Sequence, residues 1–175
     1  VQVTTPMVDI LWTIDNSGSM YDEQQDLTES FPAFMAYFLN SGLDYHIGVT
    51  STDIDGNYNG SKGKLVQIAG TKYLDVDTLD PIGMFSQMAQ LGTTGSSSEK
   101  GLGGTYKCLE ELRDTTNAGF YRDESAIHTI VISDEPDYTS AALISQPEFV
   151  EWYDNLKPEA DMRSFSAIVD FNVGS

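Results

Sequence analysis

Two kinds of hydrophobic pattern alternate along the chain. Short apolar runs rich in β-branched residues are typical of buried strands; they cover roughly 8–14, 45–50, 64–69, 127–133 and 165–169. Helical patterns are predicted between them, over roughly 20–40, 82–90, 98–113 and 146–156. Because strands alternate with helices, we predict an α/β, three-layer Rossmann-like fold with a mostly parallel central sheet and helices on both faces.

Two segments refine this prediction. The run at 64–69 follows the strand at 45–50 after a polar, glycine-rich loop, which favours a hairpin and therefore one antiparallel edge strand. Five apolar residues at helical spacing in the first helix are expected to face the core: Phe31, Phe34, Met35, Phe38 and Leu39.

Chain length and apolar content predict one domain. With 175 residues, of which 40% are hydrophobic, residues 1–175 can bury a single core. No run approaches the ~18 consecutive apolar residues of a membrane span, so no direct membrane insertion is expected.

The charge balance narrows the class of partner. The chain has 27 acidic against 9 basic residues, a net charge of −18. Such a surface repels phosphate backbones, so nucleic acid is excluded as an expected partner. Divalent cations and basic or neutral partners fit better, although acidity alone also serves solubility.

Cysteine and histidine offer little chemistry. Cys108 is the only cysteine, so no internal disulfide forms, and we expect it to be a small buried hydrophobe. His46 and His128 lie in strand patterns far apart, without zinc-ligand spacing. Nucleotide-binding glycine motifs and a nucleophile elbow are also absent from the sequence.

The strongest chemical signal follows the first strand. The run at 8–14 ends in Asp15-x-Ser17-x-Ser19, directly before the first predicted helix. Three oxygen donors at alternating positions of a loop can turn toward one point. This arrangement suits a hard cation such as Mg²⁺, which prefers oxygen ligands. Asp, Ser and Gly are also ordinary turn and capping residues, so this loop alone is weak evidence.

A second acidic loop meets the same edge of the predicted sheet. The strand at 127–133 ends in Asp134-Glu135-Pro136-Asp137. In open α/β sheets, ligands bind outside the carboxyl ends of the strands, and Asp15 and Asp134 both lie there.

These loops resemble the metal-ion-dependent adhesion site of von Willebrand factor type A domains, the family that includes the integrin inserted domains. Asp15, Ser17 and Ser19 match its first loop, and Asp134 matches its third. Its second loop supplies a threonine before a helix; Gly92-Thr93 matches, with Thr94 as a competitor. The resemblance implies that Ser17 and Ser19 bind the cation directly.

The same resemblance implies the remaining roles. Thr93 would bind directly or through water, and Asp15 and Asp134 would hold coordinated waters. The cation would be Mg²⁺, with Ca²⁺ or Mn²⁺ as alternatives. An open coordination position would capture a carboxylate from a protein, or a group of a glycan, without catalysis. An extracellular, cell-surface or virion-surface location fits this role.

Departures from the family keep alternatives open. Glu135 follows Asp134 where the family often has glycine, and Asp137 is near. The added negative charge of these two side chains either favours Ca²⁺ or weakens binding of an acidic ligand. In the third interpretation, both side chains simply face solvent. The family's last strand and carboxyl-terminal helix have no counterpart in 1–175. A structural role in a larger assembly with neighbouring domains is the main alternative. A metal-assisted hydrolase using Asp134, Glu135 and Asp137 is the weakest.

A second candidate cation loop begins like an EF-hand. Asp53, Asp55 and Asn57 have the expected spacing, but Tyr58 replaces the required glycine and Lys64 stands where the bidentate glutamate belongs. A hairpin loop is therefore favoured over a calcium site.

Overall fold

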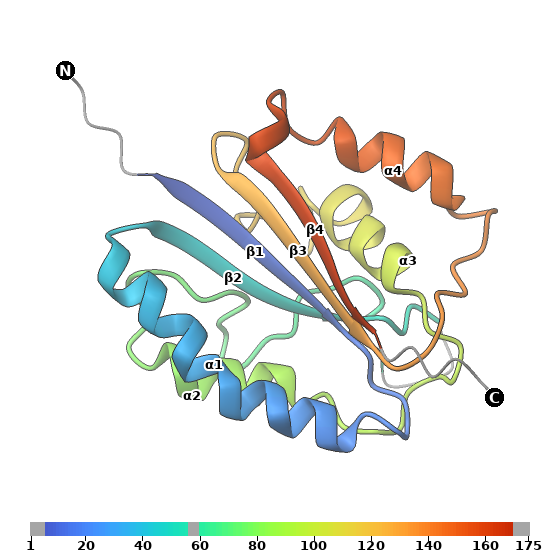
Figure 1. Ribbon diagram of the computed structural model, residues 1–175, viewed down its shortest axis with the longest axis horizontal. Helices are drawn as coiled ribbons and strands as arrows, with labels where there is room; N and C mark the ends of the chain where they lie inside the picture. Colours follow the sequence, from blue (N-terminus) through green and yellow to red (C-terminus); the bar gives the residue numbers. More distant parts are fainter. Residues whose placement is uncertain (1–5, 56–59, 170–175) are drawn as a thin grey trace.

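The sheet of this protein is parallel throughout its described part. The computed structural model describes residues 6–55 and 60–169. Its four strands have the order β2-β1-β3-β4, and each neighbouring pair is parallel (Figure 1). The strands are β1 Met7–Ile14, β2 Asp44–Ser51, β3 Ala126–Ser133 and β4 Arg163–Val169. The predicted α/β class with a mostly parallel sheet is confirmed.

Helices connect the strands. The helices are α1 Tyr21–Ser41, α2 Pro81–Ala89, α3 Gly101–Tyr106 and α4 Gln146–Asp154. A π-helical turn, Lys107–Glu111, continues α3, and a 3₁₀ turn, Ala160–Met162, precedes β4. None of the helices within 6–55 and 60–169 combines the length and apolarity that crossing a membrane requires.

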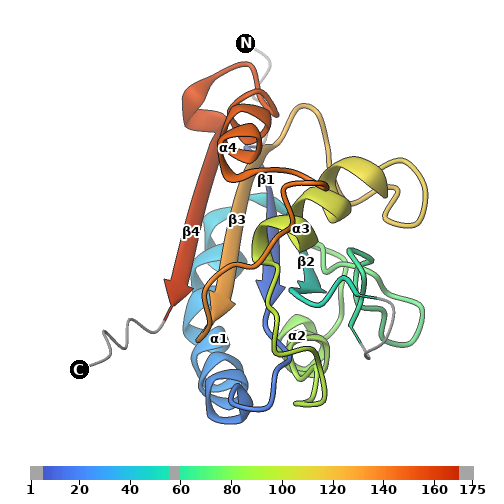
Figure 2. The same ribbon diagram turned by 90° about the vertical axis from the view of Figure 1, so that its right-hand side faces the viewer.

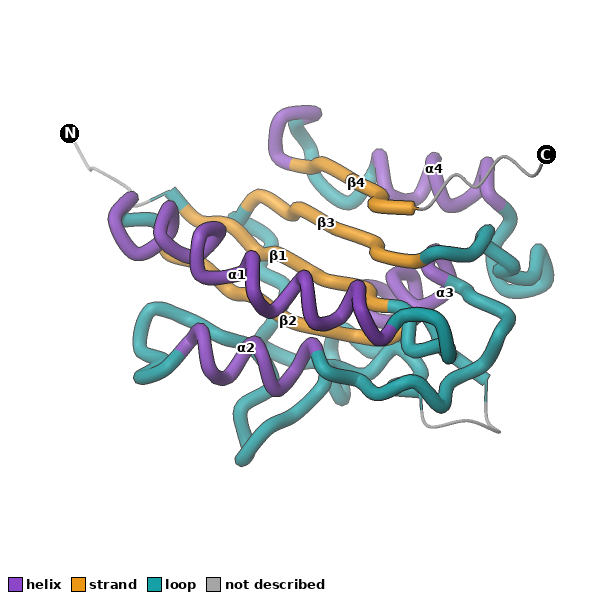
Figure 3. The backbone as a smooth tube through the Cα atoms, turned by 60° about the horizontal axis from the view of Figure 1, so that its bottom comes forward, coloured by secondary structure: helices purple, strands orange, loops and turns teal. Residues whose placement is uncertain are grey.

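The core divides into two apolar clusters because side chains alternate along β1. Ile10, Trp12 and Ile14 pack with α1 and α2. Leu11 packs instead with the cluster that includes the π-helical turn and α4. Figure 3 shows α1 and α2 along one side of the sheet and α3 and α4 on the other.

One glycine pair in α3 explains how closely this helix approaches the sheet. A Cβ on Gly101 would lie 2.7 Å from Val131 Cγ1, and one on Gly104 would lie 2.6 Å from the Ser51 carbonyl oxygen. Larger side chains would push α3 away, so glycine is required at both positions in spite of its low helix propensity.

The predicted antiparallel edge strand at 64–69 is wrong for the described sheet. Ile47 of β2 exchanges two backbone hydrogen bonds with Leu74, of 2.9 and 2.8 Å, and Val66 N donates to Val49 O. These are isolated contacts along the β2 edge rather than a ladder. Positive φ angles at Lys62 and Ala69 turn the backbone at both ends of the segment, so a continuous extended strand does not form.

One core prediction in α1 also fails. Phe31, Met35 and Phe38 are buried and Phe34 is partly buried, but Leu39 is 56% exposed. Leu39 lies about 80° around the helix axis from Phe31, so it falls off the buried stripe. Gly42, with φ of 69°, ends the helix just beyond it.

Candidate functional site

The carboxyl ends of the strands gather several loops at one edge of the sheet. Asp15 N donates to Ile132 O (2.9 Å), and Thr52 N donates to Ile14 O (3.1 Å). The ladder therefore continues one residue past β1 and β2. Figure 2 shows the arrowheads of the strands beside the loop into α1 and the chain leading to α3.

Asp15 links the first loop to the end of β3 at this edge. The side chain is fully buried, at 0% exposure. One carboxylate oxygen accepts a hydrogen bond from Ser17 N and the other accepts one from Ser133 Oγ, both at 2.7 Å. Ser17 Oγ lies 3.3 Å from Ser19 Oγ. The structure thus brings the three predicted residues of the first loop together.

The predicted second loop lies against the first. Gln24 of α1 is buried, and its Nε2 donates to Asp15 O at 2.9 Å and to Gly92 O at 3.0 Å. The Thr93 carbonyl oxygen lies 3.9 Å from the position of a Cβ on Gly18. Within the described residues, however, no hydrogen bond joins the Thr93 side chain to the first loop. Thr94 is exposed.

Glu99 is the residue of this edge that the sequence prediction missed. It precedes α3 by two positions, is only 1% exposed, and accepts a short hydrogen bond from Thr52 Oγ1. Burial raises the pKa of Glu99 to about 7; the Thr52 hydrogen bond opposes this, and the charges of Asp15 and Asp53 add to it. Its Oε1 is buried without a hydrogen-bond partner in the described part of the chain.

The acidic loop after β3 has one partly buried side chain at the edge of the sheet and two that are exposed to solvent. Asp134 is partly buried, and its Oδ1 is buried with no partner among the described residues. Glu135 is exposed. Asp137 is exposed as well, and its carboxylate accepts hydrogen bonds from Leu102 N and Thr139 N, both at 2.9 Å. Asp137 therefore ties this loop to the start of α3.

The EF-hand-like loop is held by protein groups. Asp53 is buried, and its two carboxylate oxygens accept hydrogen bonds from Ser96 N (3.2 Å) and Asp55 N (3.0 Å). Asp55 pairs with Lys100 at 2.6 Å. Asn57 lies outside the described residues. Asp53 thus joins the loop after β2 to the chain before α3, next to Glu99.

This edge of the sheet carries buried acidic side chains without basic partners among the described residues. Asp15, Asp53 and Glu99 are all buried, and within the described residues no ion pair joins any of them to a basic side chain. No set of three or more histidine, cysteine or acidic side chains in 6–55 and 60–169 is grouped to hold a metal ion. A cation here would therefore also depend on hydroxyl ligands. A cavity of about 210 Å³ adjoins Asp134, Ser133 and Glu23.

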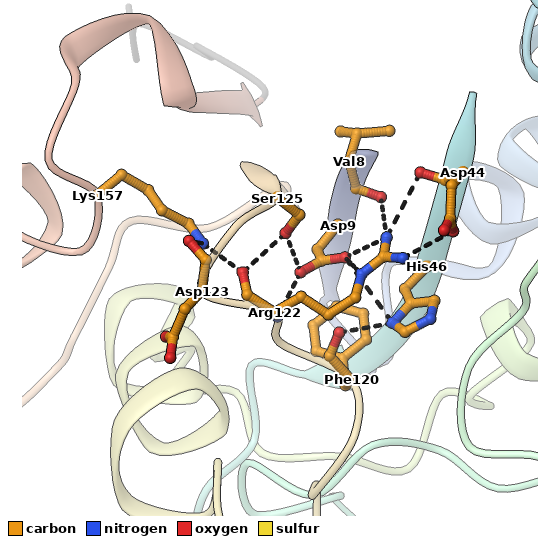
Figure 4. A network of polar contacts seen from close by, with 9 residues as sticks. All are labelled: Val8, Asp9, Asp44, His46, Phe120, Arg122, Asp123, Ser125 and Lys157. Carbon is orange, nitrogen blue, oxygen red and sulfur yellow. Dashed lines mark hydrogen bonds and ion pairs between the residues drawn. The ribbon is translucent and has the colours of Figure 1, made fainter. Parts of the chain in front are cut away.

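The amino-terminal end of the sheet holds another buried acid with different partners (Figure 4). Asp9 is 0% exposed, and Arg122 contacts its Oδ1 through Nε at 2.8 Å and Nη2 at 2.7 Å. Its Oδ2 accepts hydrogen bonds from Arg122 N and Ser125 Oγ. Arg122 Nη1 binds Asp44 at 2.7 Å. Asp9 is thus paired within the protein.

The rest of this network fixes the chain before β3. His46 Nδ1 lies 2.8 Å from Phe120 O and 3.8 Å from Asp9 Oδ1. Lys157 Nζ donates to Arg122 O at 2.6 Å. Both carboxylate oxygens of the buried Asp9 meet donors, which is typical of a structural network.

Two other residues noted in the sequence lie away from the edge. Cys108 is free and buried as predicted, and burial raises the pKa of its thiol. His128 lies in β3 with its ring beside Ser164 of β4, and burial lowers its pKa.

Comparisons with known proteins add little. No family model matches the chain, and no curated protein does. The pilus adhesin SpaC from Lactobacillus rhamnosus GG, in its open conformation, matches with TM-score 0.47 and 16% identity over 78% of this chain and 15% of the adhesin. Proximal thread matrix protein 1 from the mussel byssus matches with TM-score 0.46 and 12% identity over 94% of this chain and 38% of that protein. The chain spans well under half of either protein, and similarity at this level carries no functional argument.

Proposed function

We propose that this chain is a metal-dependent binding module of the von Willebrand factor A type. The observation that supports it is the buried edge at the carboxyl ends of the strands. Glu99 and Asp134 each present a buried oxygen without a partner in the described residues, beside the fully buried Asp15. Buried carboxylates are costly unless a positive charge compensates them. A divalent cation would supply that charge.

The donor chemistry fits a hard cation. Carboxylate and hydroxyl oxygens are the ligands that Mg²⁺ and Ca²⁺ prefer. The proposed site uses Mg²⁺, with Ca²⁺ or Mn²⁺ as substitutes, and consists of Asp15, Ser17, Ser19 and Asp134, with Thr93 as a more distant member acting through water. The bound cation would provide a Lewis-acid position for a carboxylate of a protein ligand, or for a glycan group.

The protein's own contribution is to fix these oxygens in place. Ser17 N and Ser133 Oγ hold the two carboxylate oxygens of Asp15. Gln24 ties the first loop to the chain around Gly92. Because these groups are ordered by α1 and β3, a cation and then a ligand would meet a largely preorganised surface.

The proposed partner and location follow from charge and from the resemblance. A net charge of −18 opposes nucleic acid and anionic membranes, so a protein partner with a basic or neutral surface around its acidic group is favoured. We propose a binding role without catalysis, at the cell surface, outside the cell or on a virion, next to neighbouring domains or assembly partners.

A titration of the purified chain with Mg²⁺, Ca²⁺ and Mn²⁺ tests this function. Isothermal calorimetry should show about one equivalent bound to the wild type and none to an Asp15→Ala/Ser17→Ala double variant. Ser97→Ala, which changes an exposed serine in the chain before α3, is the matched control and should bind like the wild type.

The single variant Ser17→Ala separates the binding role from the structural alternative. If the site captures ligands, this variant loses metal but keeps its fold, as measured by circular dichroism. If it instead fails to fold or assemble, the metal serves only to order loops. Absence of binding by the wild type at millimolar metal would contradict both roles for the metal.

A further inference from the structure

Glu99 is a buried side chain in the segment before α3, where the resemblance predicts Thr93 as the metal-binding residue. The second loop of the family provides its metal-binding residue just before a helix. Here Thr93 precedes α3 by eight positions, and only its backbone is seen to approach the first loop. Glu99 precedes the helix by two positions and is buried at 1% exposure. The residue that reaches the edge from this loop therefore carries a charge.

The two oxygens of Glu99 have different surroundings. Oε2 accepts a hydrogen bond from Thr52 Oγ1, which orients the carboxylate. Oε1 has no partner among the described residues although it is buried. The negative charge of Asp15 adds to the rise in the pKa of Glu99, so the two carboxylates are near neighbours. Glu99 thus places a buried carboxylate with one unpartnered oxygen near the proposed metal site.

The backbone and the neighbouring lysine leave Glu99 in this position. Tyr138 N donates to Glu99 O at 2.6 Å, which joins its main chain to the loop after β3. Lys100, the next residue, pairs with Asp55 at 2.6 Å rather than with Glu99. Glu99 and Ser133 are among the residues that line a cavity of about 100 Å³. Among the described residues, no basic side chain pairs with Glu99.

We propose that Glu99 is a resident carboxylate ligand of the metal site, which an acidic group of a partner must displace. This inference rests on the proposed metal-dependent function. An internal ligand acts at a high effective concentration, so it competes strongly with an external group of the same kind. Charge acts in the same direction. The negative charge of Glu99 itself repels a second carboxylate, so an external acidic group binds more readily once Glu99 has left.

The consequence is a site that holds its cation firmly but binds free carboxylates weakly. Replacing Glu99 by glutamine keeps an oxygen that can accept from Thr52 and removes the charge. The cation should then bind less tightly, whereas the open position should accept an external carboxylate more readily.

The test is a Mn²⁺ titration of the purified chain followed by acetate as the carboxylate probe. Electron paramagnetic resonance measures free Mn²⁺, and the water-proton relaxation rate of bound Mn²⁺ reports displacement of its water by acetate. For Glu99→Gln we expect Mn²⁺ affinity to fall by about tenfold or more. At saturating Mn²⁺ we expect its acetate affinity to rise by about tenfold over the wild type.

Two further variants keep the inference falsifiable. Glu151→Gln removes the same charge from an exposed residue of α4, outside the proposed site, and should change both affinities by less than about twofold. Glu99→Asp keeps the charge on a shorter side chain and should relieve the competition with acetate while losing less Mn²⁺ affinity than Glu99→Gln. Circular dichroism checks that each variant is folded.

The outcomes separate this inference from the proposed function. If Glu99→Gln binds Mn²⁺ as tightly as the wild type, Glu99 is not a ligand and the inference is overturned, while the metal-dependent function stands. If Glu99→Gln loses Mn²⁺ affinity but acetate binds the wild type and Glu99→Asp equally well, the displacement step is overturned. If the wild type binds no Mn²⁺, the proposed function falls and the inference falls with it.

Discussion

Two buried aspartates at opposite ends of one strand show how differently this protein treats charge. Asp9 near the start of β1 and Asp15 just after its end are both 0% exposed. Asp9 has a guanidinium partner, Arg122, at 2.7 Å. Among the described residues, the Asp15 carboxylate accepts hydrogen bonds from Ser17 and Ser133 and has no basic partner, and the acidic Glu99 lies near it.

The difference indicates which end of the sheet needs an added cation to compensate its buried carboxylates. Burying an ion costs several kcal/mol, and an opposite charge with good hydrogen bonds repays much of that cost. At the amino-terminal end Arg122 offsets part of that cost, although burial still raises the pKa of Asp9, so the opposite charge there comes from the protein itself. At the carboxyl-terminal end like charges face one another, so an added cation would stabilise the chain.

The largest expected effect comes from removing the cation of the amino-terminal end. Arg122→Ala leaves Asp9 buried without its ionic partner and should lower the free energy of unfolding by about 3–5 kcal/mol, measured by urea denaturation. Arg113, paired with the exposed Asp114, is the matched control, and Arg113→Ala should cost less than about 1 kcal/mol. Similar losses in both variants would show that Arg122 does not compensate the buried charge of Asp9.

The next effect is a dependence of metal-free stability on pH. The folded-state pKa of Glu99, about 7, lies above its ordinary value of 4.5, so the folded chain binds the proton more tightly than the unfolded chain. The free energy of unfolding should therefore fall as pH rises from about 5 to 8, by an amount on the order of 2 kcal/mol.

Urea denaturation in EDTA at several pH values measures this slope. Burial also raises the pKa of Asp9, which contributes a slope of the same sign. Glu99→Gln should therefore flatten the profile in part and be more stable than the wild type at pH 8. An unchanged pH profile in this variant would show that the pKa of Glu99 is not raised in the folded protein. In the wild type, Mg²⁺ should stabilise more at pH 8 than at pH 5, because metal binding favours the ionised carboxylate.

A matched pair of serines provides a smaller and sharper comparison. Ser125 Oγ donates to Asp9, and Ser133 Oγ donates to Asp15. Each change to alanine should lower the free energy of unfolding without metal by about 1–3 kcal/mol. Only Ser133→Ala should also weaken Mg²⁺ binding, by severalfold, because it removes a hydrogen bond that positions the Asp15 carboxylate in the proposed site. Calorimetry that shows equal Mg²⁺ affinity in both variants would argue that Asp15 does not position the metal.

The smallest effect is expected at Thr93. Its side chain makes no hydrogen bond to the first loop within the described residues, and only its carbonyl oxygen approaches Gly18. Thr93→Val should therefore change Mg²⁺ affinity by less than about threefold, well below the effect of Ser17→Ala. A loss as large as that of Ser17→Ala would place the threonine hydroxyl directly on the cation.

The sequence predicted elements whose pattern is local. The apolar runs at 8–14 and 127–133 became the two central strands, and α1 follows the helical spacing of Phe31, Met35 and Phe38. Parallel strands end at a common edge, so the approach of the loops after β1 and β3 was also predictable. The run at 64–69 failed because turns at Lys62 and Ala69 limit it to a short segment with isolated contacts to β2, and the apolar pattern does not record those turns.

The missed features depend on contacts between distant segments. Glu99 lies within the predicted helix at 98–113, and only the approach of Thr52, from the end of β2, reveals that its carboxylate is buried. Asp9 stands inside an apolar run, and its partner Arg122 is 113 positions away. An acidic residue within a buried strand does signal that a partner must exist, but the sequence does not identify which residue provides it.

The most direct test of the proposed metal site is an anomalous diffraction map from crystals grown with millimolar Mn²⁺. A cation at this site should give one strong peak at the carboxyl ends of β1 and β3, in contact with oxygens of the first loop and of Glu99, and no peak beside Asp9. A map with no peak at that edge, with Asp15 and Glu99 sharing a proton instead, would contradict the proposed site.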